Sequence, residues 1–151
     1  MNILLRPATP DDYDLLATMN RELMMDEGSR DVMSVPDLAE RMRRWLKQGW
    51  SALLVLMNKV VIGYILYQQR PDSTHTDQLE VYVRHYFIRS VFRGKGLGAA
   101  AFERIQTEYV PAGATIVLDV LATNPGARRF WEKMGFQVQA DNLRLEKRMG
   151  S

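Results

Sequence analysis

The chain has 151 residues, 46% of them apolar and 25% charged, and its 20 basic and 18 acidic side chains give a formal charge of +2. These values fit one globular domain of ordinary composition. The sequence has no cysteine, which excludes disulfides, thiol nucleophiles and thiolate metal sites and fits a reducing cytoplasm. The charge excess is too small to indicate a nucleic-acid surface, and no apolar run reaches the ~20 residues of a membrane span. We therefore expect neither nucleic acid nor a membrane as a partner.

The first third of the chain predicts a strand and two helices. Residues 3–6 form a short apolar run typical of a strand. Thr9-Pro10-Asp11-Asp12 predicts the start of a helix, because threonine caps, proline suits the first turn and aspartates favour the positive helix end. After a polar loop at 26–31, apolar residues at helical spacing predict a second helix over 36–47.

The middle of the chain changes to the pattern of strands. Residues 52–57 and 60–67 are apolar runs rich in β-branched and aromatic side chains, and Asn58-Lys59 between them predicts a two-residue hairpin turn. A long strand is expected over 79–88.

The last third predicts a helix over 96–109, a buried strand over 115–121 and a short helix over 125–134. One or two further strands are expected around 136–138 and 143–147, where apolar and polar residues alternate.

This order of elements predicts an α/β domain, in detail an α+β arrangement with a mixed sheet. The early strands are expected to be antiparallel, whereas the strand–helix–strand unit over 79–121 supplies one parallel pair through a right-handed crossover. Helices are expected on both faces of the sheet. We expect a single domain over residues 1–149, with Gly150-Ser151 as an appended tail.

A glycine-rich turn separates the long strand from the third helix. Gly94, Gly96 and Gly98 allow the backbone to curl and to present bare N–H groups to a ligand. The helix that begins there leaves its first amides unpaired at its positive end, while Arg93 and Lys95 add full charges. The turn therefore predicts a seat for an anion such as a pyrophosphate.

The same turn also fits a dinucleotide fingerprint. Residues 96–101 match G-x-G-x-x-A, and Asp119 lies about where the fingerprint has its ribose-binding acid. That fingerprint belongs to the first strand–helix turn of a parallel sheet, whereas about 90 residues precede the turn here and about 50 follow it. A nicotinamide dinucleotide enzyme is therefore the weaker alternative.

Two signatures in the chain resemble those of the GNAT family of N-acetyltransferases. The family's acetyl-CoA signature R/Q-x-x-G-x-G/A is matched by Arg93, Gly96 and Gly98. A second signature, N-x-x-A-x-x-F-Y-E-K-x-G-F, is matched by Asn124, Ala127, Phe130, Glu132, Lys133, Gly135 and Phe136. The two blocks have the spacing usual in the family, and the order of elements resembles its fold across nearly the whole chain.

The resemblance implies a GNAT acyl-CoA N-acyltransferase fold, in which a mostly antiparallel sheet contains a splayed parallel pair that admits the pantetheine arm. It implies that the backbone of the long strand bonds that arm, that the turn holds the pyrophosphate and that the last helix forms the other wall. The residues expected to bind acetyl-CoA are Phe87, Ile88, Arg93, Gly94, Lys95, Gly96, Leu97, Gly98, Ala99, Asn124 and Phe130.

One position departs from the family pattern. Trp131 stands where the family often has a tyrosine proposed to protonate the leaving thiolate, and an indole N–H does not release its proton at accessible pH. Tyr82, Tyr86 and Tyr109 are the replacement candidates. Tyr109 ends the apolar stripe of its helix, which favours a structural role for it.

The catalytic prediction rests on the long strand. In many relatives a glutamate lies eleven residues before the first signature, a spacing that falls here on Tyr82, and Glu80 lies on the same face two residues earlier. We therefore predict Glu80 and Tyr82 as the catalytic pair, with Glu80 as base or water-orienting group. In a regular strand Arg84 and Tyr86 extend this face and line a cleft, whereas His85 points to the other face unless a bulge intervenes.

The expected function is transfer of the acetyl group of acetyl-CoA to a primary amine of a small molecule, amino acid or peptide, by direct attack in a ternary complex and without a metal. The alternative is a non-catalytic acyl-CoA-binding module of the same fold. Cues to the acceptor conflict: Arg84 favours one with a carboxylate or phosphate, whereas acidic residues near the first interhelical loop favour a cationic one. A homodimer is left open.

Overall fold

A five-stranded mixed sheet forms the centre of the computed structural model, which describes residues 2–150. Ser151, half of the predicted appended tail, lies outside the described residues. The strand order is β1-β2-β3-β4-β5, with antiparallel pairs throughout except for the parallel pair β4–β5. The strands are β1 Ile3–Pro7, β2 Ser51–Met57, β3 Val60–Pro71, β4 Leu79–Ile88 and β5 Thr115–Leu118. The predicted mixed sheet is confirmed.

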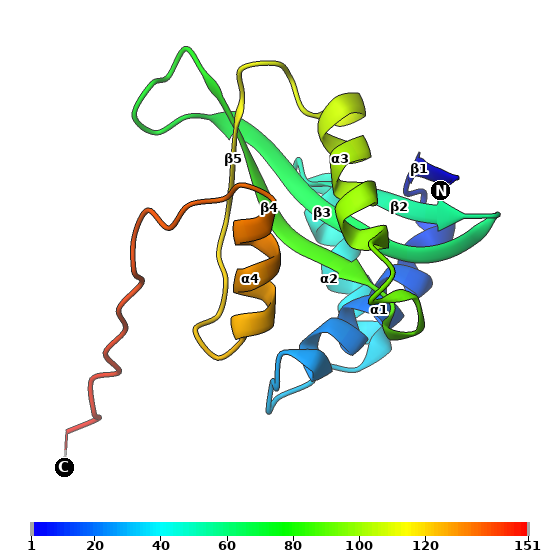
Figure 1. The fold of residues 1–151 in the computed structure, drawn as a ribbon. Helices are drawn as coiled ribbons and strands as arrows, with labels where there is room; N and C mark the ends of the chain where they lie inside the picture. The colour runs from blue at the N-terminus through cyan, green and yellow to red at the C-terminus, as the bar shows by residue number, and fades with distance from the viewer. Residues whose placement is uncertain (1, 151) are drawn as a thin grey trace.

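Helices cover both faces of this sheet, as predicted (Figure 1). One face carries α1 Tyr13–Asp26 and α2 Val35–Lys47, and the other carries α3 Leu97–Tyr109 and α4 Pro125–Lys133. Short 3-10 turns at Pro10–Asp12 and Ser90–Phe92 precede α1 and follow β4. No helix within residues 2–150 combines the length and apolarity needed to cross a membrane.

The core lies on both faces because successive residues of a strand point to opposite sides. On β2, Leu54 packs toward α1 and α2, while its neighbour Leu53 packs toward α3 and α4. Leu66 and Ile65 of β3 divide in the same way. Burial on both sides explains why these strands read as continuous apolar runs rather than as an alternating pattern.

The hairpin between β2 and β3 turns at Asn58 and Lys59, as predicted. Their φ angles of 51° and 68° lie in the left-handed region, which a two-residue hairpin of matching twist requires at both central positions.

The C-terminal strands predicted around 136–138 and 143–147 are wrong. The chain has no strand after Leu118 within the described residues, and it runs away from the sheet beyond α4 (Figure 1). Leu143 and Leu145 are 91% and 92% exposed. Alternating apolar residues favour an extended backbone, but a strand also requires a pairing partner. The predicted strand over 115–121 is also too long, because β5 ends at Leu118.

A β-bulge at Arg84 divides β4 into two halves. Val83 pairs with Tyr67 and His85 with Leu66, so Arg84 has no opposite residue on β3. A bulge adds one residue and thereby exchanges the faces of all later side chains. The prediction that Tyr86 shares a face with Tyr82 is therefore wrong. Tyr86 lies on the α3–α4 face, whereas His85 lies with Tyr82 on the α1–α2 face.

Candidate active site

The parallel pair β4–β5 separates halfway along β4. The two strands pair from Glu80 and Thr115 to Val83 and Leu118, after which β4 continues to Ile88 with no strand beside it on this side among the described residues. Backbone N–H and C=O groups at such an edge are available to bond an extended ligand. The splay expected from the resemblance is therefore present, and it begins at Arg84.

The glycine-rich turn lies directly beyond the splayed end of β4. Gly94 and Gly96 have φ angles of 78° and 76°, which favour glycine, and Gly96 is the residue before the first turn of α3. A Cβ atom at either position would meet nothing within 4 Å, so backbone conformation, not crowding, requires glycine here. The exposed turn and the first amides of α3 form a surface that fits a pyrophosphate.

Arg93 braces this turn. Its Nε donates to the carbonyl oxygen of Ile88 at 2.7 Å, and its Nη2 donates to Asp26 Oδ2 at 2.6 Å. Its guanidinium carbon lies 5.2 Å from the centre of the Phe87 ring. Arg93 therefore ties the turn to both β4 and the end of α1, while the neighbouring Lys95 is exposed.

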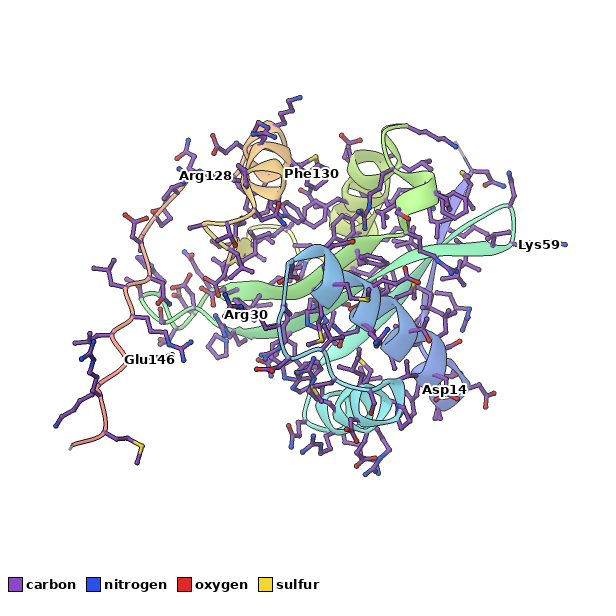
Figure 2. The ribbon with its side chains drawn as sticks, turned by 90° about the horizontal axis from the view of Figure 1, so that it is seen from below. Asp14, Arg30, Lys59, Arg128, Phe130 and Glu146 are labelled. Atoms are coloured by element: carbon purple, nitrogen blue, oxygen red, sulfur yellow. The ribbon has the colours of Figure 1, made fainter. Side chains whose placement is uncertain are left out.

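Helix α4 forms the opposite wall of the splayed segment. Asn124 caps this helix, since its Oδ1 accepts from the Ala127 amide at 3.1 Å. Phe130 lies on the side of α4 that faces α3 (Figure 2), and its ring is 3.7 Å from the position that a Cβ of Gly98 would take. The fold therefore brings the second signature beside the first.

Trp131 belongs to an aromatic cluster rather than to an open surface. Its ring centre lies 4.8 to 5.5 Å from those of Phe130, Phe102, Phe136 and Tyr86, and the residue is 9% exposed. Tyr86 stacks on Phe130 and donates from its hydroxyl to the Gly98 carbonyl at 2.6 Å. Burial raises the pKa of Tyr86 above its usual value, so the phenol keeps its proton.

A hydroxyl–carboxylate pair stands where β4 and β5 part. Tyr82 donates from its hydroxyl to Asp119 Oδ2 at 2.7 Å, and Asp119 is the first residue after β5. Burial, and then the bond to Asp119, raise the pKa of Tyr82 to about 12. Sequence reasoning considered Asp119 only as a ribose acid. The predicted strand over 115–121 contained Asp119, and only the earlier end of β5 at Leu118 puts this residue beyond the carboxyl end of a parallel strand, where ligands bind in α/β sheets.

Glu80 lies in the fully paired part of the sheet. It is opposite Arg70 on β3 and Thr115 on β5, and its carboxylate bonds Arg70 Nε at 2.5 Å. Four residues, or roughly 13 Å of strand, separate it from the start of the splay at Arg84. The two predicted catalytic residues therefore share a face, but only Tyr82 reaches the opening.

His85 lies on the same face as Tyr82, a placement that regular strand alternation does not predict. Its Nδ1 lies 3.0 Å from the Tyr64 hydroxyl, and its ring meets the edge of Trp45 at 5.5 Å. Burial, and then the charges of Arg41 and Arg84, lower the pKa of His85 to about 3. His85 is therefore neutral at physiological pH.

This lowered pKa predicts a dependence of stability on pH. The unfolded chain protonates His85 near pH 6.5 while the folded chain does not, so its contribution is present above pH 6.5 and is lost as pH falls toward 3. The free energy of unfolding of the wild type should fall between pH 7 and pH 5 as the unfolded chain takes up this proton. In His85→Gln, which lacks the titrating group, we expect the fall to be about 1–2 kcal/mol smaller. Urea titrations at both pH values measure this, and equal losses in the two proteins would contradict the pKa shift.

A splayed strand pair, a glycine turn at a helix start and a capped helix opposite it define an acyl-CoA transferase fold. The chain belongs to the acetyltransferase (GNAT) family, whose model matches residues 17–136. No curated protein sequence matches the chain significantly.

Solved structures share this fold at low sequence identity. A possible acetyltransferase from Clostridium difficile 630 is 17% identical with a TM-score of 0.78, and the match covers 99% of this chain and 100% of that one. A predicted acetyltransferase from Clostridium acetobutylicum with acetyl-CoA is 18% identical, with a TM-score of 0.74 and 96% of both chains covered. The aminoglycoside N-acetyltransferase AAC(6')-Iy in complex with CoA is 14% identical, with a TM-score of 0.75 and coverage of 98% and 96%.

Proposed function

We propose that this protein, as one domain over residues 1–149, is a cytoplasmic enzyme that transfers the acetyl group of acetyl-CoA to a primary amine of a small molecule, amino acid or peptide. Membership of the acetyltransferase family supports acetyl transfer. The observation that supports an amine acceptor is the Tyr82–Asp119 pair at the opening between β4 and β5. A carboxylate at this opening supports the proposal, because an attacking amine must lose a proton.

The cofactor side is proposed from the splay and the turn. The amides of residues 94–99 would hold the pyrophosphate, with Lys95 and Arg93 supplying positive charge. The backbone of Phe87 and Ile88, at the edge left free by β5, would bond the pantetheine arm as an added strand. Asn124 and Phe130 would border the arm from α4. Two of the structural neighbours contain acetyl-CoA or CoA, which supports this assignment.

On the acceptor side, acetyl-CoA supplies the thioester and the chain positions the amine. We propose that Asp119 accepts the amine proton, directly or through a water, while the Tyr82 hydroxyl fixes the orientation of the carboxylate. The amine nitrogen then forms the C–N bond as the C–S bond breaks. Glu80 is the other candidate base, although its bond to Arg70 and its distance from the splay favour Asp119.

Protonation of the leaving thiolate requires a group other than Trp131. Among the tyrosines, Tyr86 is the one on the splayed half of β4 with a protonated hydroxyl beside the first turn of α3. Because that hydroxyl already donates to the Gly98 carbonyl and burial raises its pKa, we propose a water as the proton donor, and we assign Trp131 to packing within the α4 wall.

The test is release of free thiol from acetyl-CoA in the presence of a panel of amines that includes amino acids, peptides and an aminoglycoside. We expect turnover with at least one amine and none without an acceptor. The second candidate function, a non-catalytic acyl-CoA-binding module, is favoured by the Trp131 position. Tight binding of acetyl-CoA without turnover on any amine would establish the module and overturn the enzyme.

A further inference from the structure

Two arginines from different elements converge on one tryptophan beside the opening. The guanidinium carbons of Arg41 on α2 and Arg84 at the β4 bulge each lie 4.5 Å from the centre of the Trp45 ring. Arg84 is also 5.5 Å from the ring of Trp50. We call these four residues the arginine–tryptophan patch.

Neither arginine of the patch has a carboxylate partner among residues 2–150. Within the described part of the chain, Arg41 bonds only a neutral group, donating from Nη2 to Asn20 Oδ1 at 3.1 Å. Eight other arginines do have carboxylate partners within 4.0 Å, namely Arg6, Arg43, Arg70, Arg89, Arg93, Arg104, Arg128 and Arg144. The patch therefore differs from the ordinary pattern of this chain.

Holding these charges together without an anion is unfavourable. Arg41 Nε and Asn20 Nδ2, both donors, are buried without an acceptor among the described residues. The guanidinium groups of Arg41 and Arg84 pack on the same ring, and like charges held this close repel. Burial, and then the charge of Arg84, accordingly lower the pKa of Arg41. Desolvated charge is stable only when it is paired, so an anion bound here would relieve the repulsion.

The patch borders the acceptor side of the opening. Arg84 is the first residue of the half of β4 that does not pair with β5. The ring of Trp50 lies 6.1 Å from that of Tyr82, and the Tyr82 hydroxyl bonds Asp119. Trp50 and Tyr82 therefore connect the patch to Asp119.

We propose that the acceptor is an amine that also carries a carboxylate, as a free amino acid does, and that the carboxylate binds between Arg84 and Arg41. This inference rests on the proposed acetyltransferase function. The planar fork of arginine matches the two oxygens of a carboxylate, and the indole rings of Trp45 and Trp50 pack against the guanidinium of Arg84. The amine of the same molecule then lies toward Asp119, so one ligand satisfies both charges.

The test compares amino acids with their C-terminal amides, which keep the amine and lose the negative charge. We expect kcat/KM to be about tenfold to hundredfold higher for the acids. Arg84→Gln, at an exposed position, is expected to remove this preference by lowering kcat/KM for the acids alone, with the KM for acetyl-CoA unchanged. Arg44→Gln, an exposed arginine on the same helix as Arg41, is the matched control and should keep the preference.

Turnover of acids and amides at equal rates, with Arg84→Gln affecting neither, would overturn this inference and leave the acetyltransferase function standing. If no amine is turned over, binding still tests the patch. In that case the intrinsic tryptophan fluorescence of the CoA-saturated protein is titrated with N-acetylalanine and with N-acetylalaninamide. Tighter binding of the acid, lost in Arg84→Gln, would support the anion site even though the enzyme proposal had failed, and equal binding would reject it.

Discussion

Asp119→Asn is expected to lower kcat by about 10²–10³ while leaving the KM for acetyl-CoA unchanged. The amide keeps the size of the side chain and still accepts a hydrogen bond from Tyr82, but it cannot take up the amine proton. The loss should therefore appear in the chemical step. Steady-state kinetics with the best amine of the panel measure it, and raising the pH should restore part of the rate because more of the amine is then already deprotonated.

Two variants give this result its controls. Tyr82→Phe removes the hydroxyl that holds Asp119 and is expected to lower kcat less than Asp119→Asn does. The double variant should be no slower than Asp119→Asn alone, since both residues act through one carboxylate. Glu80→Gln is expected to change kcat by less than about threefold. If Glu80→Gln causes the large loss and Asp119→Asn does not, the base is Glu80 and the assignment of Asp119 is wrong.

Gly63→Ala is expected to destabilise the fold by about 2–4 kcal/mol and to lower Tm by roughly 6–12 °C. A Cβ at this position would lie 2.1 Å from the Phe87 carbonyl oxygen and 3.1 Å from Ile88 Cα. These are backbone atoms, so β3 and β4 must separate to admit the methyl group. Because the same residues carry the proposed pantetheine contacts, the KM for acetyl-CoA should rise as well.

Gly126→Ala is the matched control for this substitution. Gly126 lies in α4, where a Cβ would make only ordinary contacts at 3.7 and 3.9 Å, and alanine favours a helix by roughly 0.5–1 kcal/mol over glycine. Thermal unfolding of the two variants should therefore shift in opposite directions. A stability for Gly63→Ala within 0.5 kcal/mol of the wild type, on the order of a neutral surface change, would show that the strands separate freely at this point.

The sequence by itself determined the features that depend on near neighbours. The hairpin at Asn58-Lys59, the left-handed turn at Gly94 and Gly96 and the cap at Asn124 are set by residue types within a few positions, and all three occur in the structure. The mixed sheet and the family were also predictable, because element order and two signatures fix them. The predicted binding residues gather around one splay, although their individual roles stay predictions.

Only the tertiary structure decided what faces the opening. The bulge at Arg84 exchanges the faces of His85 and Tyr86, yet one extra residue leaves the local apolar pattern of β4 unchanged. Tyr82 and Asp119 are 37 residues apart, and the two arginines of the patch come from α2 and β4, so their contacts depend on how the strands and helices pack. The tail shows the same limit, since the alternation at 143–147 favours a strand but cannot supply its partner.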